Sequence, residues 1–164
     1  MTFSAIADVL TDRFGPDAFT TNSQAIQPFL TVPTAKLADL CQFLRDDDRL
    51  FFDLLACVTG IDNGPDVDTM EVIYNLTSIP YGHDLMLRVV MPRSPAGGRL
   101  PSVPSVAHLW RTADWHEREA YDLVGIWFDN HPDLRRILMP ADWVGHPLRK
   151  DYQEETQYHG IQTK

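Results

Sequence analysis

Three runs of alternating apolar residues lie within forty positions of one another and constrain the fold more than any other feature. Alternation at every second position is typical of a strand that buries one face. A turn-rich stretch, residues 60–68, separates the first run from the second. A short connection with Pro80 and Gly82 joins the second run to the third, which predicts an antiparallel hairpin. The runs are Phe52, Leu54, Ala56 and Val58; Met70, Val72, Tyr74 and Leu76; and Leu85, Leu87, Val89 and Met91.

Two amphipathic helices and one further strand are predicted before these runs. Gly15-Pro16 ends the first helix, Pro33-Thr34 opens the second, and residues 46–48, all Asp, are interpreted as a solvated helix end. Residues 24–32 look like a strand, and Pro28 places it at a sheet edge because proline cannot donate to a ladder. The helical faces hold Phe3, Ile6, Leu10 and Phe14, then Leu37, Leu40, Cys41 and Leu44.

This order of elements predicts an α+β fold, a two-layer sandwich of a mostly antiparallel sheet with helices, followed by an extended C-terminal arm. The chain has 164 residues, of which 44% are hydrophobic, so it is long enough to bury one core. Its apolar stretches are too short to cross a bilayer, and we expect no signal peptide in the acidic N-terminal segment.

The composition changes after Met91. All four tryptophans and five of the six histidines follow it, and we predict a helical stretch with Val106, Leu109, Trp110 and Ala113 on one face. Asp114 and Glu117 then have the spacing of a capping box that opens a further helical segment, which Gly125 ends. We divide the chain into residues 1–91, an α/β sandwich core; 92–125, a proline-rich loop with helices; and 126–164, the extended arm, which we expect to lie on a partner.

The charge distribution argues against nucleic acid as a partner. The net charge is −9, whereas binding to phosphates requires clustered Lys and Arg. Residues 1–90 hold 13 acidic and 5 basic residues, and residues 91–164 hold 10 acidic and 9 basic residues, so the two stretches have different surfaces. Cys41 and Cys57 are too few for a four-thiolate metal or cluster site, and we expect both to be buried thiols.

The residues between 114 and 122 hold most of the candidates for chemistry. His116 and Glu119 could contact one ion, but two ligands are too few, and Ala120 stands where a metalloprotease motif needs histidine. Glu117 is either the partner of the Asp114 cap or a partly buried ligand for a guanidinium, and Arg118 has the spacing to pair with Asp122. No nucleophile or nucleotide motif occurs, so we expect no catalytic, cofactor-binding or metal-ligating residues.

A longer stretch carries a more specific signal. ADWHEREAYDLVGIWFDNHPDLRRILMPADWVGHPLRKDY, which ends at Tyr152, resembles the signature region of the C-type subunit of respiratory complex I, the NADH–quinone oxidoreductase. Val124 stands where a bulky aromatic residue is expected, and Gln153 where proline is common. The matching residues are Glu117, Arg118, Glu119, Asp122, His131, Arg135, Arg136, Trp143, Arg149, Lys150, Asp151 and Tyr152.

The resemblance implies a non-catalytic structural subunit of the peripheral arm of that complex. It implies no cofactor on this chain, whereas the parent complex carries NADH, FMN, iron–sulfur clusters and quinone and couples electron transfer to proton translocation. The implied partners are chiefly the D-type subunit, then the B-type subunit and the neighbouring cluster-bearing subunits. The implied location is peripheral, on the cytoplasmic side of the inner membrane, without insertion into it. The matching residues would then be candidate partner contacts, with Trp143 and Arg149 as anchors.

Three alternatives stay open at this point. Related sequences occur in membrane-bound hydrogenases, in formate-hydrogenlyase-type complexes and in the photosynthetic NDH complex. An autonomous metal-dependent hydrolase would use His116, Glu119 and His131. A free binding module for a small acidic ligand would use Arg135, Arg136 and Arg149, although pairing with acidic residues suits these arginines better.

Overall fold

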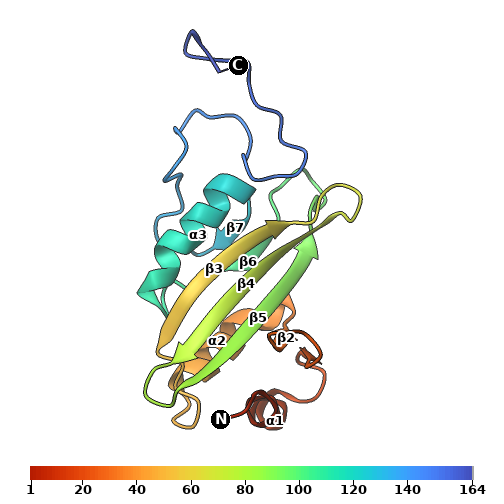
Figure 1. Ribbon diagram of the computed structural model, residues 1–164, viewed down its shortest axis with the longest axis vertical. Helices are drawn as coiled ribbons and strands as arrows, with labels where there is room; N and C mark the ends of the chain where they lie inside the picture. The colour runs from red at the N-terminus through yellow and green to blue at the C-terminus, as the bar shows by residue number, and fades with distance from the viewer. Residues whose placement is uncertain (164) are drawn as a thin grey trace.

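The computed structural model describes residues 1–163 (Figure 1). Five strands form one sheet in the order β1-β2-β5-β4-β3, in which β2 and β5 are parallel and the other neighbours antiparallel. The elements are α1 (Phe3–Phe14), β1 (Thr20–Asn22), β2 (Phe29–Thr31), η1 (Thr34–Lys36), α2 (Leu37–Asp46), β3 (Leu54–Asp62), β4 (Thr69–Ser78), β5 (His83–Pro92), β6 (Ser102–Pro104), α3 (Arg111–Val124), β7 (Trp127–Asp129), β8 (Gln157–Tyr158) and β9 (Ile161–Gln162).

The core lies on one face of this sheet. The alternating residues of β4 and β5 are almost completely buried, and Tyr74 stands opposite Leu87 in the hairpin register. Figure 1 shows α2 behind the sheet, and α1 contacts α2 through an edge-to-face pair of Phe14 and Phe43, whose ring centroids lie 5.5 Å apart. The predicted mixed α+β fold with a mostly antiparallel sheet is confirmed, as are the two N-terminal helices and the hairpin.

The predicted pattern of the first strand is wrong. The buried residues around the start of β3 are Phe52, Leu55 and Val58, whereas Ala56 is exposed. The register between β3 and β4 shifts between Leu55 and Cys57. A bulge places an extra residue on one strand and reverses which face the following side chains occupy, so simple alternation could not hold here.

The strand predicted over residues 24–32 exists only in part, and its predicted position at the sheet edge is wrong. β2 covers only Phe29–Thr31, and β1 pairs with its outer side, so β2 lies inside the sheet. Pro28 precedes the paired residues, and its missing N–H therefore removes no bond from the ladder.

The second half contains one helix where two segments were predicted. α3 runs without interruption from Arg111 to Val124 and packs against β3, and Gly125 ends it with a φ of 78°. A side chain at Gly60 of β3 would crowd this contact, because its Cβ would lie 3.1 Å from the Ile126 side chain and 3.2 Å from that of Ala120. β7 then pairs in parallel with β6. Residues 130–156, all within the described chain, contain no helix or strand (Figure 1).

Candidate functional site

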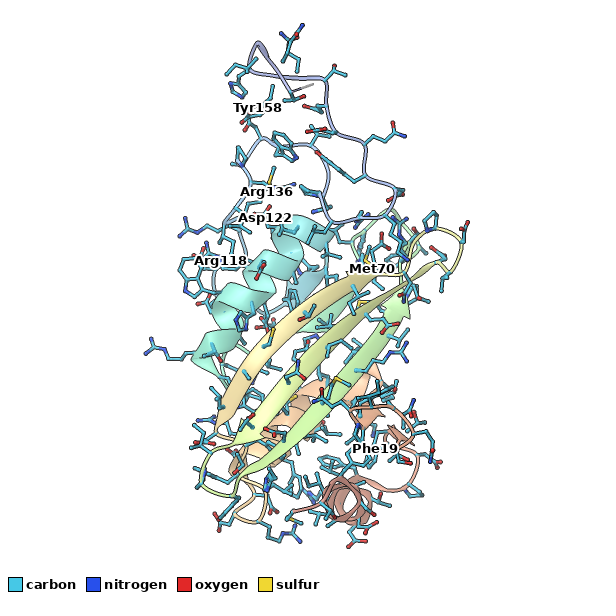
Figure 2. The ribbon with its side chains drawn as sticks, in the orientation of Figure 1. Phe19, Met70, Arg118, Asp122, Arg136 and Tyr158 are labelled. Carbon is cyan, nitrogen blue, oxygen red and sulfur yellow. The ribbon has the colours of Figure 1, made fainter. Side chains whose placement is uncertain are left out.

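The residues of the signature stretch meet where the C-terminal end of α3 faces the segment that follows β7. Figure 2 shows Asp122 and Arg136 at this end of α3 and Arg118 nearer the middle of the helix, with the rest of the segment continuing beyond Arg136. We call residues 114–125 together with residues 131–152 the signature junction. The contacts between these two segments are mainly hydrogen bonds and ion pairs, whereas the neighbouring sheet is held together by apolar packing.

Asp122 is the centre of the junction. Its buried carboxylate accepts three successive backbone N–H groups at Oδ2, from Ile137 at 3.0 Å, Leu138 at 2.7 Å and Met139 at 2.9 Å. Burial alone would raise the pKa of Asp122, but these three donors and Arg136 lower it below its usual value. A single side chain of α3 therefore orders a loop that has no secondary structure of its own.

Arg136 completes this network. Its Nη1 donates to Oδ1 of Asp122 at 2.8 Å, and its Nη2 donates to the carbonyl oxygens of Trp143 and Gly145 at 3.1 and 2.9 Å. The predicted pairing of Asp122 with Arg118 is wrong, because Asp122 pairs with Arg136 instead. Arg136 thus ties two separate parts of the loop to one carboxylate.

Arg149 and His146 close the end of α3. Arg149 donates from Nε to the carbonyl oxygen of Val124 at 2.8 Å and from Nη2 to that of Gly125 at 3.1 Å. His146 donates from Nδ1 to the carbonyl oxygen of Asp122 at 2.9 Å. These bonds satisfy carbonyl groups that a helix end leaves free, and a cation is favourable there. A Cβ at Gly125 would overlap both side chains.

Glu117 behaves differently from either sequence-based interpretation. Its carboxylate is completely buried and accepts hydrogen bonds from Ser105 Oγ at 2.6 Å and from the N–H of Val106 at 2.8 Å. It caps no helix, because α3 begins at Arg111, and no ion pair among residues 1–163 joins it to Lys or Arg. Burial raises its pKa to about 7, although the two hydrogen bonds act in the opposite direction.

Arg118 and Glu119 point away from Glu117. The Arg118 guanidinium lies 4.7 Å from the ring centroid of Trp115, and its Nε donates to the carbonyl oxygen of Arg135 at 3.3 Å. Glu119 is exposed and lines a small groove with residues 57–60 of β3. Among the described residues, Arg118 therefore forms no ion pair with Glu117.

A second attachment joins the segment to the sheet. Arg93 donates from Nε to Asp62 at 2.7 Å and also contacts Asp151, and the N–H of Lys150 donates to Asp62 at 2.8 Å. Burial would raise the pKa of Asp62, but these bonds, with one from the N–H of Gly64, lower it to about 2. Sequence reasoning missed Asp62 and Arg93, because no local spacing connects residues 31 and 58 positions apart.

The remaining signature residues are more accessible. Trp143 is half-buried and donates from Nε1 to the hydroxyl of Tyr152 at 3.0 Å. Arg135 is exposed and pairs with Asp133 at 2.9 Å. The exposed Lys150 donates from Nζ to the carbonyl oxygen of Asn63 at 3.1 Å.

Three aliphatic side chains of the junction extend into solvent. Leu138, Val144 and Leu148 are 61%, 62% and 61% exposed, although their backbones lie within the ordered loop. The N–H of Leu138 is the middle one of the three that donate to Asp122, and the N–H of Leu148 donates to the carbonyl oxygen of Leu123 at 2.8 Å. We call these three residues the aliphatic patch.

The junction does not form a metal site. Within residues 1–163, no three His, Cys, Asp or Glu side chains are grouped so that they could hold an ion. His116, Glu119 and His131 are therefore not brought together as the hydrolase alternative requires, and the His131 side chain is fully buried.

Cys41 is buried as expected, whereas Cys57 is only partly buried. None of the helices in the described part of the chain has the length and apolar character of a membrane span.

Most of the chain matches the model of a known protein family. The family model of the respiratory-chain NADH dehydrogenase 30 kDa subunit matches residues 30–158, which include most of the sheet, α3 and the whole signature junction. The chain belongs to this family. The resemblance seen in residues 113–152 is thus confirmed over most of the sequence.

Bacterial members of the family support the same assignment. The chain is 44% identical over 159 residues to the C-type subunit of NADH-quinone oxidoreductase from Chlorobium phaeobacteroides, covering 96% of this chain and 92% of that protein. It is 43% identical over 155 residues to the same subunit from Chloroherpeton thalassium, covering 93% of this chain and 62% of the relative. It is 46% identical over 124 residues to the same subunit from Salinispora arenicola, covering 75% of this chain and 49% of the relative. The chain therefore spans between half and nine-tenths of the length of these relatives.

A solved structure supports the fold independently. A chain from the membrane-bound sulfane sulfur reductase, an archaeal respiratory membrane complex, matches with a TM-score of 0.68 and 20% identity, covering 92% of this chain and 85% of that chain. At this identity the likeness shows that the fold is shared.

Proposed function

We propose that this chain is a structural subunit of the peripheral arm of an NADH–quinone oxidoreductase. In this role it supports the quinone-reducing module while electrons pass from NADH to quinone, coupled to proton translocation. Membership of the 30 kDa subunit family over residues 30–158 carries this proposal. The curated relatives described above are all named as the C-type subunit of NADH-quinone oxidoreductase, which favours this complex over a hydrogenase or a photosynthetic complex.

The proposed division of labour follows the three stretches of the chain. Residues 1–91 form a sandwich core, residues 92–125 connect it to α3, and residues 126–164 form an arm that lies along a partner. The D-type subunit is the main proposed partner, with the B-type subunit and the other cluster-bearing subunits beside it. FMN, the iron–sulfur clusters, NADH and quinone then bind to those other subunits, and this chain is peripheral on the cytoplasmic side of the membrane.

The signature residues serve this contact in two ways. The buried carboxylate of Asp122 and the partly buried guanidinium groups of Arg136 and Arg149 hold the loop in one conformation through contacts within the chain. The aliphatic patch, with Trp143 and Tyr152 beside it in sequence, then meets the partner as a preformed surface. A preformed surface loses less conformational entropy when it binds, and this strengthens association.

A substitution in the aliphatic patch tests the proposal. We expect the double variant Leu138→Glu and Leu148→Glu to fold normally but to lower the amount of assembled complex on native gels at least tenfold, about 1.4 kcal/mol. NADH–quinone reductase activity should fall in proportion to the lost complex.

A matched control distinguishes interface loss from a general effect of surface charge. Ile79 is 65% exposed in the β4–β5 connection, far from the junction, so Ile79→Glu should leave complex abundance unchanged. Full assembly of the double variant would show that the aliphatic patch does not lie in the interface. Full assembly with slow turnover would instead indicate a direct role in the reaction.

A further inference from the structure

Within residues 1–163, the groups around Glu117 include weak acids and no Lys or Arg that pairs with it. Tyr74 of β4 and Cys41 of α2 interact electrostatically with its carboxyl group, and so does Asp114 one turn earlier on α3. The loop after β6 supplies two hydrogen-bond donors, Ser105 and the N–H of the next residue. Among residues 1–163, the only basic side chain within 4 Å of the carboxyl group is a histidine.

That histidine, His131, closes the fourth side. Its side chain is completely buried. Its Nε2 lies 3.1 Å from the carbonyl oxygen of Asp114, 3.5 Å from the carboxylate oxygen Oδ1 of the same residue and 3.9 Å from Oε2 of Glu117. Its Nδ1 lies 3.0 Å from the backbone nitrogen of Asp133. A backbone N–H can only donate, so Nδ1 must accept and carries no proton, whereas Nε2 must carry the proton that it donates to Asp114. The hydrogen-bond network thus assigns His131 as neutral.

A neutral His131 leaves an ionised Glu117 without a counter-ion. Burying a charge that has no partner is strongly unfavourable, and two hydrogen bonds offset only part of this effect. Protonating His131 at Nδ1 would supply the counter-ion, but it would also break the bond from Asp133 that holds the turn. Burial without a counter-ion therefore favours a carboxyl group that retains its proton, against the two hydrogen bonds that favour its ionised form.

We propose that Glu117 is a proton-dependent switch for the start of the C-terminal segment. While the proton is bound, the His131 side chain covers the neutral carboxyl group and keeps water away from it. When the proton leaves the carboxyl oxygen for a water molecule or buffer base, the His131 side chain withdraws so that water reaches the carboxylate. No covalent bond other than the O–H bond of the carboxyl group breaks.

The switch acts locally because the neighbouring attachments do not depend on it. His131 and Asp133 lie at the beginning of the segment, whereas Asp122 holds residues 137–139 through separate hydrogen bonds. Withdrawal of His131 loosens the turn over residues 131–134 and leaves the later loop in place. The raised pKa of Glu117, about 7, puts the transition near neutrality.

Nuclear magnetic resonance on the full-length chain can follow both halves of the switch. The ¹³C shift of the Glu117 carboxyl group reports its ionisation, and amide exchange at Asp133, corrected for intrinsic rates, reports the turn. Between about pH 6 and about pH 8.5, we expect the protection of Asp133 to fall at least about tenfold while that of Leu138 does not change.

Two variants assign the effect to Glu117. Glu117→Gln keeps the shape but cannot ionise, so the protection of Asp133 should no longer depend on pH. Asp114→Asn keeps Glu117 and removes a neighbouring negative charge that raises its pKa, so the fall should persist and shift to lower pH.

Three results would overturn the proposal. These are a Glu117 carboxyl midpoint below about pH 5, equal protection of Asp133 at both pH values, or the same loss of protection in Glu117→Gln. The carboxyl midpoint needs only the wild-type chain, so the test remains decisive even if the glutamine variant does not fold. Because no partner is involved, the outcome is independent of the proposed role in the complex.

Discussion

The sheet and the C-terminal segment are held in place by different interactions. In β4 and β5, apolar side chains at every second position are buried against one another, with Tyr74 opposite Leu87 as an example. In residues 131–152, a few charged side chains satisfy backbone groups of a loop without regular structure, chiefly through Asp122. The comparison shows that a polar network can order a surface segment that has too little apolar area to form a core.

The two regions should consequently fail in different ways. Loss of an apolar side chain from the sheet weakens the whole fold, because α1, α2, α3 and the long strands share one core. Loss of one network residue should release the segment and leave the sheet intact, since stability is not uniform across a structure.

The largest expected effect belongs to the sheet. Leu87→Ala removes a completely buried side chain from the centre of the core. We expect the global free energy of unfolding to fall by about 2–5 kcal/mol, as measured by urea denaturation. A loss below about 1 kcal/mol would show that the sheet is not the cooperative centre of the fold.

Disrupting the hydrogen-bond network of Asp122 should change the free energy of attachment of the C-terminal segment by nearly as much, but only locally. Asp122→Asn leaves Arg136 and three backbone donors with a poorer acceptor, which we expect to weaken attachment of the segment by about 3 kcal/mol. Trypsin should then cleave after Arg135, Arg136 and Arg149 about a hundredfold faster. Asp133→Asn, at an exposed position, is the control, and equal cleavage of both variants would contradict the account.

The second attachment should make stability depend on acid. The pKa of Asp62 is lowered from 3.8 to about 2 in the folded chain, so its stabilising contribution is complete above 3.8 and disappears as pH falls through about 2. That contribution is about 2 kcal/mol. Urea denaturation of wild type and Asp62→Asn should differ most near neutral pH and converge toward pH 2; a difference that does not change with pH would exclude this origin.

The smallest effect is expected at the surface of the junction. Arg135 and Asp133 form an ion pair whose side chains are 70% and 53% exposed. Arg135→Ala should change the melting temperature little, because such pairs contribute at most about 1 kcal/mol. A clear loss of stability would mean that the Arg135 side chain contributes through packing, because the variant keeps the backbone carbonyl that accepts from Arg118.

The features that depend on local periodicity could be predicted from the sequence. The β4–β5 hairpin, α1 and α2 follow from apolar spacing, and the family follows from residues 113–152. The bulge after Leu55 was missed because residues 54–58 are all apolar. In such a run, the apolar pattern looks regular whether or not a residue is inserted.

The organisation of the junction could not be predicted in the same way. Asp122 bonds to backbone N–H groups, which every residue except proline has, so no side-chain pattern marks them. Glu117 had the spacing of a capping box with Asp114, but tertiary packing placed it against Ser105 instead. The bonds from the Arg149 guanidinium to the end of α3 were not predicted, and its role as a partner anchor stays a prediction.

Amide hydrogen exchange on the isolated full-length chain tests the central claim, that Asp122 orders the segment without any partner. The amides of Ile137, Leu138 and Met139 should exchange at least about a hundredfold more slowly than in an unfolded peptide, and Asp122→Asn should abolish this protection while the β4 and β5 amides keep theirs. Exchange of these three amides at the unfolded rate in the wild-type chain would contradict the account, because the segment would then be ordered only by its partner.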